Sequence, residues 1–282
     1  AISFWGLNLG IDFKGGSILE AEFPAGTTVT DAAVHEALNK VGQEDALVRT
    51  TNVGDKSGYI VRTHSLTEPE RQSISSAFTS LGGEVKRLDT VGPILGQELQ
   101  KKAVSSIVFV LIAIMLFITY AFRHVSLPVS SWKYASVALI ALAHDVIVPL
   151  GVFSFLGRNG GFEIDALFIT ALLVILGFSI HDTIVVFDRT RENLKNGELK
   201  RRSFEHVVGM SVQETFSRSI NTSLTTIIAL VVLWFLGPTT VKNFSLALII
   251  GIVVGTYSSI FIGSPLLVTL QKWQAKRANK SS

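Results

Sequence analysis

Five apolar runs in the second half of the chain restrict the fold more than any other feature. A helix needs about 20 apolar residues to cross the roughly 30 Å of hydrocarbon in a bilayer. The runs cover about 103–122, 134–157, 164–187, 219–236 and 243–271. Only 17% of the 282 residues are charged, whereas soluble chains average about 25%, so core helices of a soluble protein explain the runs poorly. We therefore predict an α-helical polytopic membrane bundle over residues 98–272.

The charges divide the chain into two unlike parts. Residues 1–100 hold 8 Lys and Arg against 13 Asp and Glu, while the remaining residues hold 17 against 9. Segments 123–133, 188–218 and 272–282 together carry 13 Lys and Arg, against 2 in the other connections between spans. Lys and Arg favour the cytoplasmic side of a membrane. We therefore expect the loop 188–218 and the basic tail 273–282 inside the cell, and residues 1–97 outside it.

An outside domain at the start of a chain needs an upstream signal peptide or helix for its export. The sequence begins at Ala1, without Met, and no apolar run precedes the domain. We therefore expect one more transmembrane helix upstream of Ala1.

Residues 1–97 alternate short strand-like and helix-like segments. Strand patterns cover 17–23, 46–53, 58–63 and 84–91, and helix patterns cover 30–41 and 68–81. The order βαββαβ predicts a small α+β ferredoxin-like extracytoplasmic domain. Its sequence shows no nucleophile–base pair, metal cluster or phosphate loop, and Gly15-Gly16 indicates a tight turn. Because this fold hosts many functions, we expect a docking module rather than an enzyme.

Two His-Asp pairs, His144-Asp145 and His181-Asp182, lie inside apolar runs. Ionisable side chains within a span are costly, by ~2.5–3.5 kcal/mol on insertion scales, and are usually functional. One interpretation is a proton relay, and the other is a set of hydrogen bonds that hold the helices together. Metal phosphohydrolases also use His-Asp pairs, but this chain has only six His and no Cys, and both pairs lie in apolar helices. We expect no metal and no cofactor, with protons as the coupling ion.

Arg218 precedes a run that is polar for a span and includes Thr222 and Thr225. Such a face is expected to point into the bundle. There Arg218 can pair with Asp182 and hold it ionised until protonation releases the arginine. The alternative is an arginine that extends to the lipid headgroups.

Two weaker signals concern helix packing and the membrane surface. Gly251 and Gly255 form a GxxxG pair, which permits close contact between helices. Residues 188–218 are basic, and Ser203 is a candidate cap for a short helix that lies on the inner leaflet. Attraction to the membrane surface explains this charge, so we expect no nucleic-acid partner.

Several motifs resemble those of the SecF family. Gly10–Gly16 (GIDFKGG) is similar to the family's GIDFxGG motif, and Asp182–Asn193 (DTIVVFDRTREN) is similar to the signature that closes its fourth helix. Ala143–Asp145, Val91–Pro93 and Arg218–Ser223 fit the same family, in order along the chain. The family has six helices, with the outer domain after the first, so the resemblance implies that the first helix is missing here. A SecF half of a fused SecDF chain fits equally well.

The resemblance implies a function that composition does not show. SecF pairs with SecD in an RND-type unit of the bacterial cytoplasmic membrane, where the proton motive force promotes late steps of preprotein translocation. The implied partners are SecD, the SecYEG channel, SecA, the accessory subunits YajC and YidC, the preprotein and the lipid bilayer. The implied proton pathway comprises Asp182, Arg218, Asp145 and His144, with His181, Thr222 and Thr225 as minor contributors.

Two other functions stay open at this point. One is half of another proton-driven RND-type exporter, for a lipid or a drug, which would share the bundle and the carboxylate within it. The other is a passive structural partner that only supports another subunit. In each case we expect a transport or accessory subunit and not an enzyme.

Overall fold

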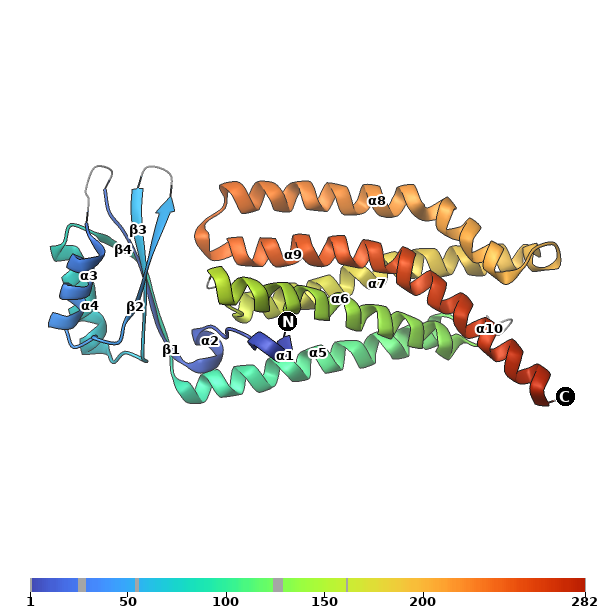
Figure 1. The fold of residues 1–282 in the computed structure, drawn as a ribbon, viewed down its shortest axis with the longest axis horizontal. Helices are drawn as coiled ribbons and strands as arrows, with labels where there is room; N and C mark the ends of the chain where they lie inside the picture. Colours follow the sequence, from blue (N-terminus) through green and yellow to red (C-terminus); the bar gives the residue numbers. More distant parts are fainter. Residues whose placement is uncertain (1, 25–28, 54–55, 124–128, 161, 282) are drawn as a thin grey trace. The chain divides into compact units, whose positions relative to one another are not determined.

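The computed structural model describes residues 2–24, 29–53, 56–123, 129–160 and 162–281. The chain divides into two compact units (Figure 1), and each is described here by itself. The sheet unit is Leu9–Ala103, and the helical unit comprises Ala1–Asn8 and Val104–Ser282. We expected residues 1–97 to form one domain, so the boundary differs at both ends.

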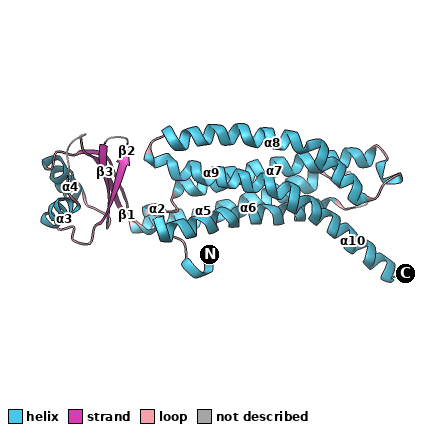
Figure 2. Cartoon of the chain, turned by 45° about the horizontal axis from the view of Figure 1, so that its top comes forward, coloured by secondary structure: helices cyan, strands magenta, loops and turns pink. Residues whose placement is uncertain are grey.

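The sheet unit has the predicted order of strands and helices. Its strands are β1 (Gly16–Glu22), β2 (Leu47–Val53), β3 (Lys56–Thr63) and β4 (Glu84–Val91), and its longer helices are α3 (Asp31–Lys40) and α4 (Glu68–Ser80). The sheet order is β2-β3-β1-β4, and all neighbouring strands are antiparallel. Both helices cover one face of the sheet (Figure 2). This is the topology of a split βαβ fold, so the ferredoxin-like prediction is confirmed.

The Gly15-Gly16 pair turns the chain from α2 (Ile11–Lys14) into β1. Gly15 has a φ of +77°, a conformation that residues with a Cβ rarely adopt. A Cβ there would also lie 2.8 Å from the Cα of Pro93, the first residue of α5 (Pro93–Ala121). The predicted tight turn is therefore confirmed.

Alternate side chains of β1 fill the core of the sheet unit. Leu19 and Ala21 are each 2% exposed, and they belong to one buried cluster with Leu38 of α3 and Phe78 of α4. Residues two apart on a strand point to the same face, so one face of β1 is apolar. The Thr30 side chain caps the start of α3, as the sequence predicted.

Replacing Phe78 by Ala is expected to destabilise the sheet unit by about 3–5 kcal/mol, because truncating a buried aromatic side chain leaves a cavity. Phe78 is 0% exposed, and its ring lies 6.5 Å from that of Phe23. Hydrogen exchange of the β1 and α4 amides in the whole protein measures the loss. Leu47→Ala is the matched control, since Leu47 is 70% exposed. Equal loss of protection in the two variants would contradict this core.

Five helices are long and apolar enough to cross a membrane: Pro93–Ala121, Ser131–Asn159, Ala166–Lys195, Phe204–Leu236 and Thr240–Arg277. After α5 they belong to α6 (Ser131–Gly160), α7 (Ala166–Lys195), α8 (Phe204–Leu236), and the run of α9 (Thr239–Ser258), η2 (Ser259–Gly263) and α10 (Ser264–Ser281). The short η2 segment is a π-helix that joins α9 to α10. All five predicted spans are therefore long helices.

The segment 188–218 is mostly helix rather than the loop that we expected. α7 continues to Lys195 and α8 begins at Phe204, and the 3-10 turn η1 (Glu198–Lys200) lies between them. Ser203 caps the start of α8, as predicted. However, α8 continues without a break into the span, so the expected separate helix on the membrane surface is not formed.

The first residues of the chain, with α1 (Ile2–Trp5), belong to the helical unit, and two residues that follow α1 hydrogen-bond to it. Ser154 Oγ in α6 donates a hydrogen bond to the Gly6 carbonyl oxygen (2.6 Å), and the Ile164 N–H donates to that of Asn8 (2.8 Å). These bonds explain why the unit boundary falls after Asn8.

α9 approaches α7 closely at the GxxxG pair. A Cβ on Gly251 would lie 2.2 Å from Ile175 Cδ1, and a Cβ on Gly255 would lie 2.9 Å from Ser179 Cβ. Small residues here let the two helix backbones pack together. The predicted close contact is therefore present, and it brings polar side chains of α7 and α9 within reach of one another.

Candidate functional site

Asp182 lies inside the helical unit where α7, α8 and α9 meet. Its side chain is 2% exposed, and Thr256 Oγ1 of α9 lies 3.3 Å from its Oδ2. Ser223 Oγ of α8 lies 2.5 Å from Thr256 Oγ1. The carboxyl group therefore faces two hydroxyl groups that come from two other helices.

These two hydroxyls do not saturate the carboxylate. A hydroxyl carries a single hydrogen. Thr256 Oγ1 also lies 2.9 Å from the Ile252 carbonyl oxygen, and Ser223 Oγ lies 2.8 Å from that of Ser219. Each hydrogen is thus shared between Asp182 and a carbonyl group of its own helix. Asp182 can gain or lose a proton without breaking a fixed set of short hydrogen bonds.

Helical periodicity in α7 directs Asp182 inward. Ser179 and Val186, which lie three positions before it and four after it, are also buried. His181 lies about 100° further round the helix. Its side chain is 66% exposed, and its Nδ1 is 4.0 Å from Asp182 Oδ1. The two members of this His-Asp pair therefore have very different surroundings.

Asp145 is held more firmly than Asp182. It is 0% exposed, and its Oδ2 accepts hydrogen bonds from Ser179 Oγ of α7 (2.5 Å) and Ser258 Oγ of α9 (2.7 Å). Its Oδ1 lies 2.9 Å from Nδ1 of His144, its neighbour in α6. One carboxyl group thus joins three helices, which favours the interpretation that this pair holds the bundle together. A role for it in the proton pathway stays a prediction.

Replacing Asp145 by Ala is expected to destabilise the helical unit by about 1–3 kcal/mol, because buried hydroxyl groups lose their acceptor. Thermal unfolding of the detergent-solubilised protein measures the change. Asp145→Asn keeps an acceptor oxygen and is expected to lose less. Asp188→Ala is the control, since Asp188 is 56% exposed and pairs with Arg191 of the same helix. An Asp145→Ala variant as stable as this control would show that the carboxyl group is no anchor.

Arg218 does not form the predicted ion pair with Asp182. The α8 residue that hydrogen-bonds this carboxyl group is Ser223, five positions after Arg218. Five residues turn a helix by about 140° beyond a full turn, so the two side chains leave α8 in different directions. Hydropathy alone could not reveal this, because the polar run that follows Arg218 surrounds much of the helix.

Arg218 instead lines a polar cavity of about 400 Å³ between α7 and α8. The cavity also touches Val185, one turn beyond Asp182. Another of its residues, Arg189, lies 2.6 Å from carboxylate oxygens of both Glu192 and Glu214. A space lined by charged groups can hold ordered water. It is therefore a candidate route for protons from the polar end of α7 toward Asp182.

Thr222 and Thr225 lie away from this site. Thr222 is half-buried, and Thr225 is exposed with its hydroxyl donating to the Asn221 carbonyl oxygen of its own helix (3.0 Å). The hydroxyls that meet the two buried carboxyl groups belong to Ser179, Ser223, Thr256 and Ser258. The GxxxG pair could have predicted the α9 hydroxyls, Thr256 and Ser258, because residues next to this pair face α7.

Metal binding was not expected from the sequence. Across the described ranges, no three His, Asp or Glu side chains are grouped so that they could hold a metal ion. The chemistry that the two buried carboxyl groups offer is proton exchange and hydrogen bonding.

Comparisons with known proteins agree with this architecture. The family model described as "Protein export membrane protein SecD/SecF, C-terminal" matches residues 73–273, and the "SecD/SecF GG Motif" matches residues 2–23. The SecF subunit of Thermobaculum terrenum is 42% identical over 285 aligned residues, which cover 96% of this chain and 86% of the relative. SecF of a Synechocystis strain is 35% identical, covering 95% and 84% of the two chains.

Solved SecDF structures have the same fold. SecDF from a Thermus species, described as a translocon-associated membrane protein, superposes with a TM-score of 0.80 at 34% identity, over 96% of this chain. A super-membrane-facing form of SecDF gives a TM-score of 0.68 at 31% identity. This chain spans 35% and 37% of those two chains, or about a third of their length. With five apolar helices and these relatives, the protein is a multi-pass membrane protein, and it belongs to the SecF family of protein translocase subunits.

Proposed function

We propose that this SecF chain works with SecD to use the proton motive force in late steps of preprotein translocation across the bacterial cytoplasmic membrane. The observation that carries the proposal is Asp182, a carboxyl group buried within a span and only loosely hydrogen-bonded at the junction of α7, α8 and α9. Ionisable groups in such positions serve proton relays. The sheet unit lies on the outer side and the C-terminus in the cytoplasm, as the Lys and Arg bias indicates.

Protons reach Asp182 through the polar cavity between α7 and α8. Arg218 lines this cavity together with Glu214 and Arg189. Val185 also lines it and lies one helical turn from Asp182, so the cavity ends close to the carboxyl group. Protonation removes a charge, so the shared hydroxyl hydrogens turn from Asp182 to their own helices. One charge moving through 100 mV supplies about 2.3 kcal/mol, which biases a two-state equilibrium about fiftyfold. This shift in the equilibrium favours a state in which α7 packs differently against α8 and α9.

SecD is the partner that we propose for the exposed stripe of α7. Leu167, Val174 and His181 lie seven positions apart on this helix and are 40%, 47% and 66% exposed. A histidine facing lipid within a span is costly, so a helix of another subunit covers it. SecYEG, SecA, YajC and YidC are the further partners that we propose from the SecF resemblance, and the related SecDF is described as translocon-associated.

The test is preprotein translocation into membrane vesicles that contain SecYEG and SecA. Adding SecD with this protein is expected to speed late translocation only while a proton gradient is present. Equal stimulation after an uncoupler collapses the gradient would make the chain a passive partner. No stimulation, together with gradient-driven loss of a lipid or drug from the vesicles, would identify another RND-type exporter.

A further inference from the structure

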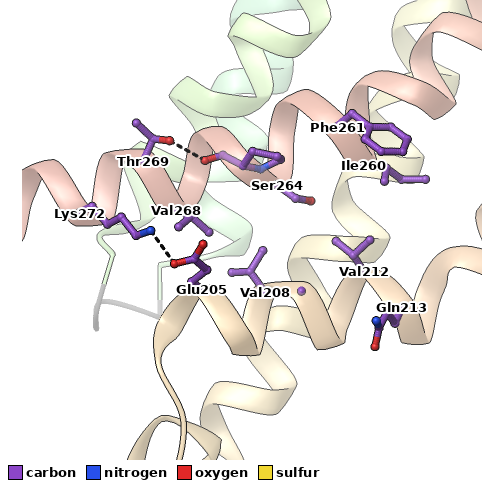
Figure 3. A pocket seen from close by; sticks show the side chains of 12 residues that line it. Glu205, Val208, Val212, Gln213, Ile260, Phe261, Ser264, Val268, Thr269 and Lys272 are labelled. Carbon is purple, nitrogen blue, oxygen red and sulfur yellow. Dashed lines mark hydrogen bonds and ion pairs between the residues drawn. The ribbon is translucent and has the colours of Figure 1, made fainter.

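An apolar groove runs along the helical unit between α8 and the α9–η2–α10 segment. Two adjoining cavities form it, of about 500 and about 330 Å³. Both are lined by Ile260 and Phe261 of the π-helix η2. In the first cavity, Val208 of α8 faces Val268 of α10, and Val212 of α8 faces Ile260 of η2 (Figure 3). π-helical segments often occur at functional sites.

The groove has the size and lining of a ligand site. Pockets for small ligands span about 300–1,000 Å³ and are mostly apolar with a few polar groups. The groove extends from Val253 to Lys272, and these 19 residues of helix rise about 28 Å. One leaflet is about half of the 30 Å hydrocarbon layer, so an acyl chain fits along it. A second helix, about 10–12 Å across, is a poorer match to cavities of this size.

One end of the groove is basic. Lys272 lines it and lies 2.5 Å from Glu205 Oε2 across the mouth (Figure 3). Lys276, one turn further along the same face of α10, is exposed. Arg202 precedes α8 at the same end and lines an adjoining cavity together with Glu205. Basic groups between membrane helices at an aqueous boundary suit anionic lipid headgroups.

We propose that this groove binds one phospholipid with an anionic headgroup. The phosphate lies at Lys272 and Lys276, and an acyl chain extends past η2. At the far end of the groove the chain covers Ser223 and Thr256, whose hydroxyls lie beside Asp182 on the other side of α8 and α9. The lipid therefore keeps water from reaching Asp182 between α8 and α9. Binding needs no proton transfer, so it stands independently of the proposed function.

Gly209→Leu tests the apolar part of the site. Gly209 lines the first cavity, and a Cβ there meets nothing within 4 Å, so a leucine enters the groove without disturbing the fold. Gly177→Leu is the matched control, because a Cβ at that exposed α7 position also meets nothing within 4 Å. Native mass spectrometry of the delipidated full-length protein counts bound dioleoyl phosphatidylglycerol and dioleoyl phosphatidylcholine. We expect the first variant to lose phosphatidylglycerol and the control to keep it.

Charge variants test the headgroup. Lys272→Gln with Lys276→Gln is expected to weaken phosphatidylglycerol binding by about tenfold and leave phosphatidylcholine unchanged. Glu205→Gln removes the competing carboxylate from Lys272 and is expected to strengthen phosphatidylglycerol binding. Opposite effects of the two changes cannot come from general loss of structure, and melting temperatures check the fold of each variant.

Three outcomes would overturn the proposal. Equal binding by the Gly209 and Gly177 variants would place the lipid elsewhere. Equal affinity for the two lipids would remove the role of the basic end. If Gly209→Leu released a co-purified membrane subunit while phosphatidylglycerol binding stayed constant, the groove would be a protein interface.

Discussion

An Asp182→Asn variant, reconstituted with SecD, is expected to lose gradient-driven proton uptake by about 100-fold, the lower end of what a positioned proton-transfer group contributes. Asparagine has nearly the shape of aspartate but cannot ionise. The neighbours of Asp182 are hydroxyl groups, which also hydrogen-bond an amide, so the packing of α7 survives the change. Uptake is measured with a pH-sensitive dye in proteoliposomes under an imposed gradient, and gradient-dependent translocation is expected to fall in parallel.

Asp165→Asn is the matched control for this experiment. It makes the same chemical change in the same part of the chain, because Asp165 caps α7 by accepting a hydrogen bond from the Phe168 N–H (2.7 Å). Asparagine caps helices about as well as aspartate, so wild-type uptake is expected. Asp182→Glu keeps an ionisable group and is expected to retain part of the activity. Wild-type uptake by Asp182→Asn would reject Asp182 as the proton carrier.

Hydropathy predicted the spans well but not where their helices end. The expected third span stops at residue 187, whereas α7 reaches Lys195. Past residue 187, Arg189 binds Glu192 within the helix and Glu214 on α8. These ion pairs stabilise a helical stretch of charged residues, which a hydropathy plot cannot detect. A sequence window therefore marks the edge of the hydrocarbon rather than the end of the helix.

The carboxyl groups of the site could be predicted, but not their partners. An acid inside an apolar run is rare enough to be noticed by its type alone. Serine and threonine are common in spans, and their hydroxyls usually bond to their own helix, as Thr225 does. Which hydroxyl meets Asp182 depends on how α8 and α9 are rotated. That rotation is set by packing at Gly251 and Gly255, which the sequence reveals only as a spacing.

The contrast between the two buried acids also required the structure. As sequence, His144-Asp145 and His181-Asp182 are nearly equivalent. In the fold, Asp145 accepts two hydrogen bonds of 2.5 and 2.7 Å from neighbouring helices, while Asp182 accepts one of 3.3 Å from Thr256 and shares the Ser223 hydroxyl with a carbonyl group of α8. A strongly bonded carboxyl group is suited to holding helices, and a weakly bonded one is suited to exchanging its proton. The two carboxyl groups contact α9 only two residues apart, Asp182 at Thr256 and Asp145 at Ser258, so the firmly held acid and the weakly held acid are close neighbours in the bundle.

Gly251→Ala is expected to destabilise the helical unit by about 2–3 kcal/mol, although it adds a single methyl group. That methyl would lie 2.2 Å from Ile175 Cδ1 and 2.3 Å from its Cγ1, so α7 and α9 must move apart. The movement also separates Thr256 of α9 from Asp182 of α7. It disturbs the Asp145 site as well, because that α6 carboxyl group accepts hydrogen bonds from Ser179 of α7 and Ser258 of α9 at once. Gradient-driven proton uptake is therefore expected to fall together with the melting temperature in detergent.

Ile175→Ala distinguishes a local clash from general fragility of α9. It removes the atoms that the new methyl would meet, so the double variant with Gly251→Ala is expected to melt at a higher temperature than Gly251→Ala alone. Residues in contact commonly couple by 0.5–3 kcal/mol. Gly177→Ala is the control on α7, since a Cβ there meets nothing within 4 Å, and it is expected to be neutral or stabilising because alanine favours helix. If Ile175→Ala and Gly251→Ala were simply additive, α7 and α9 would not be in contact at this point, and the junction that holds Asp182 would have to be built differently.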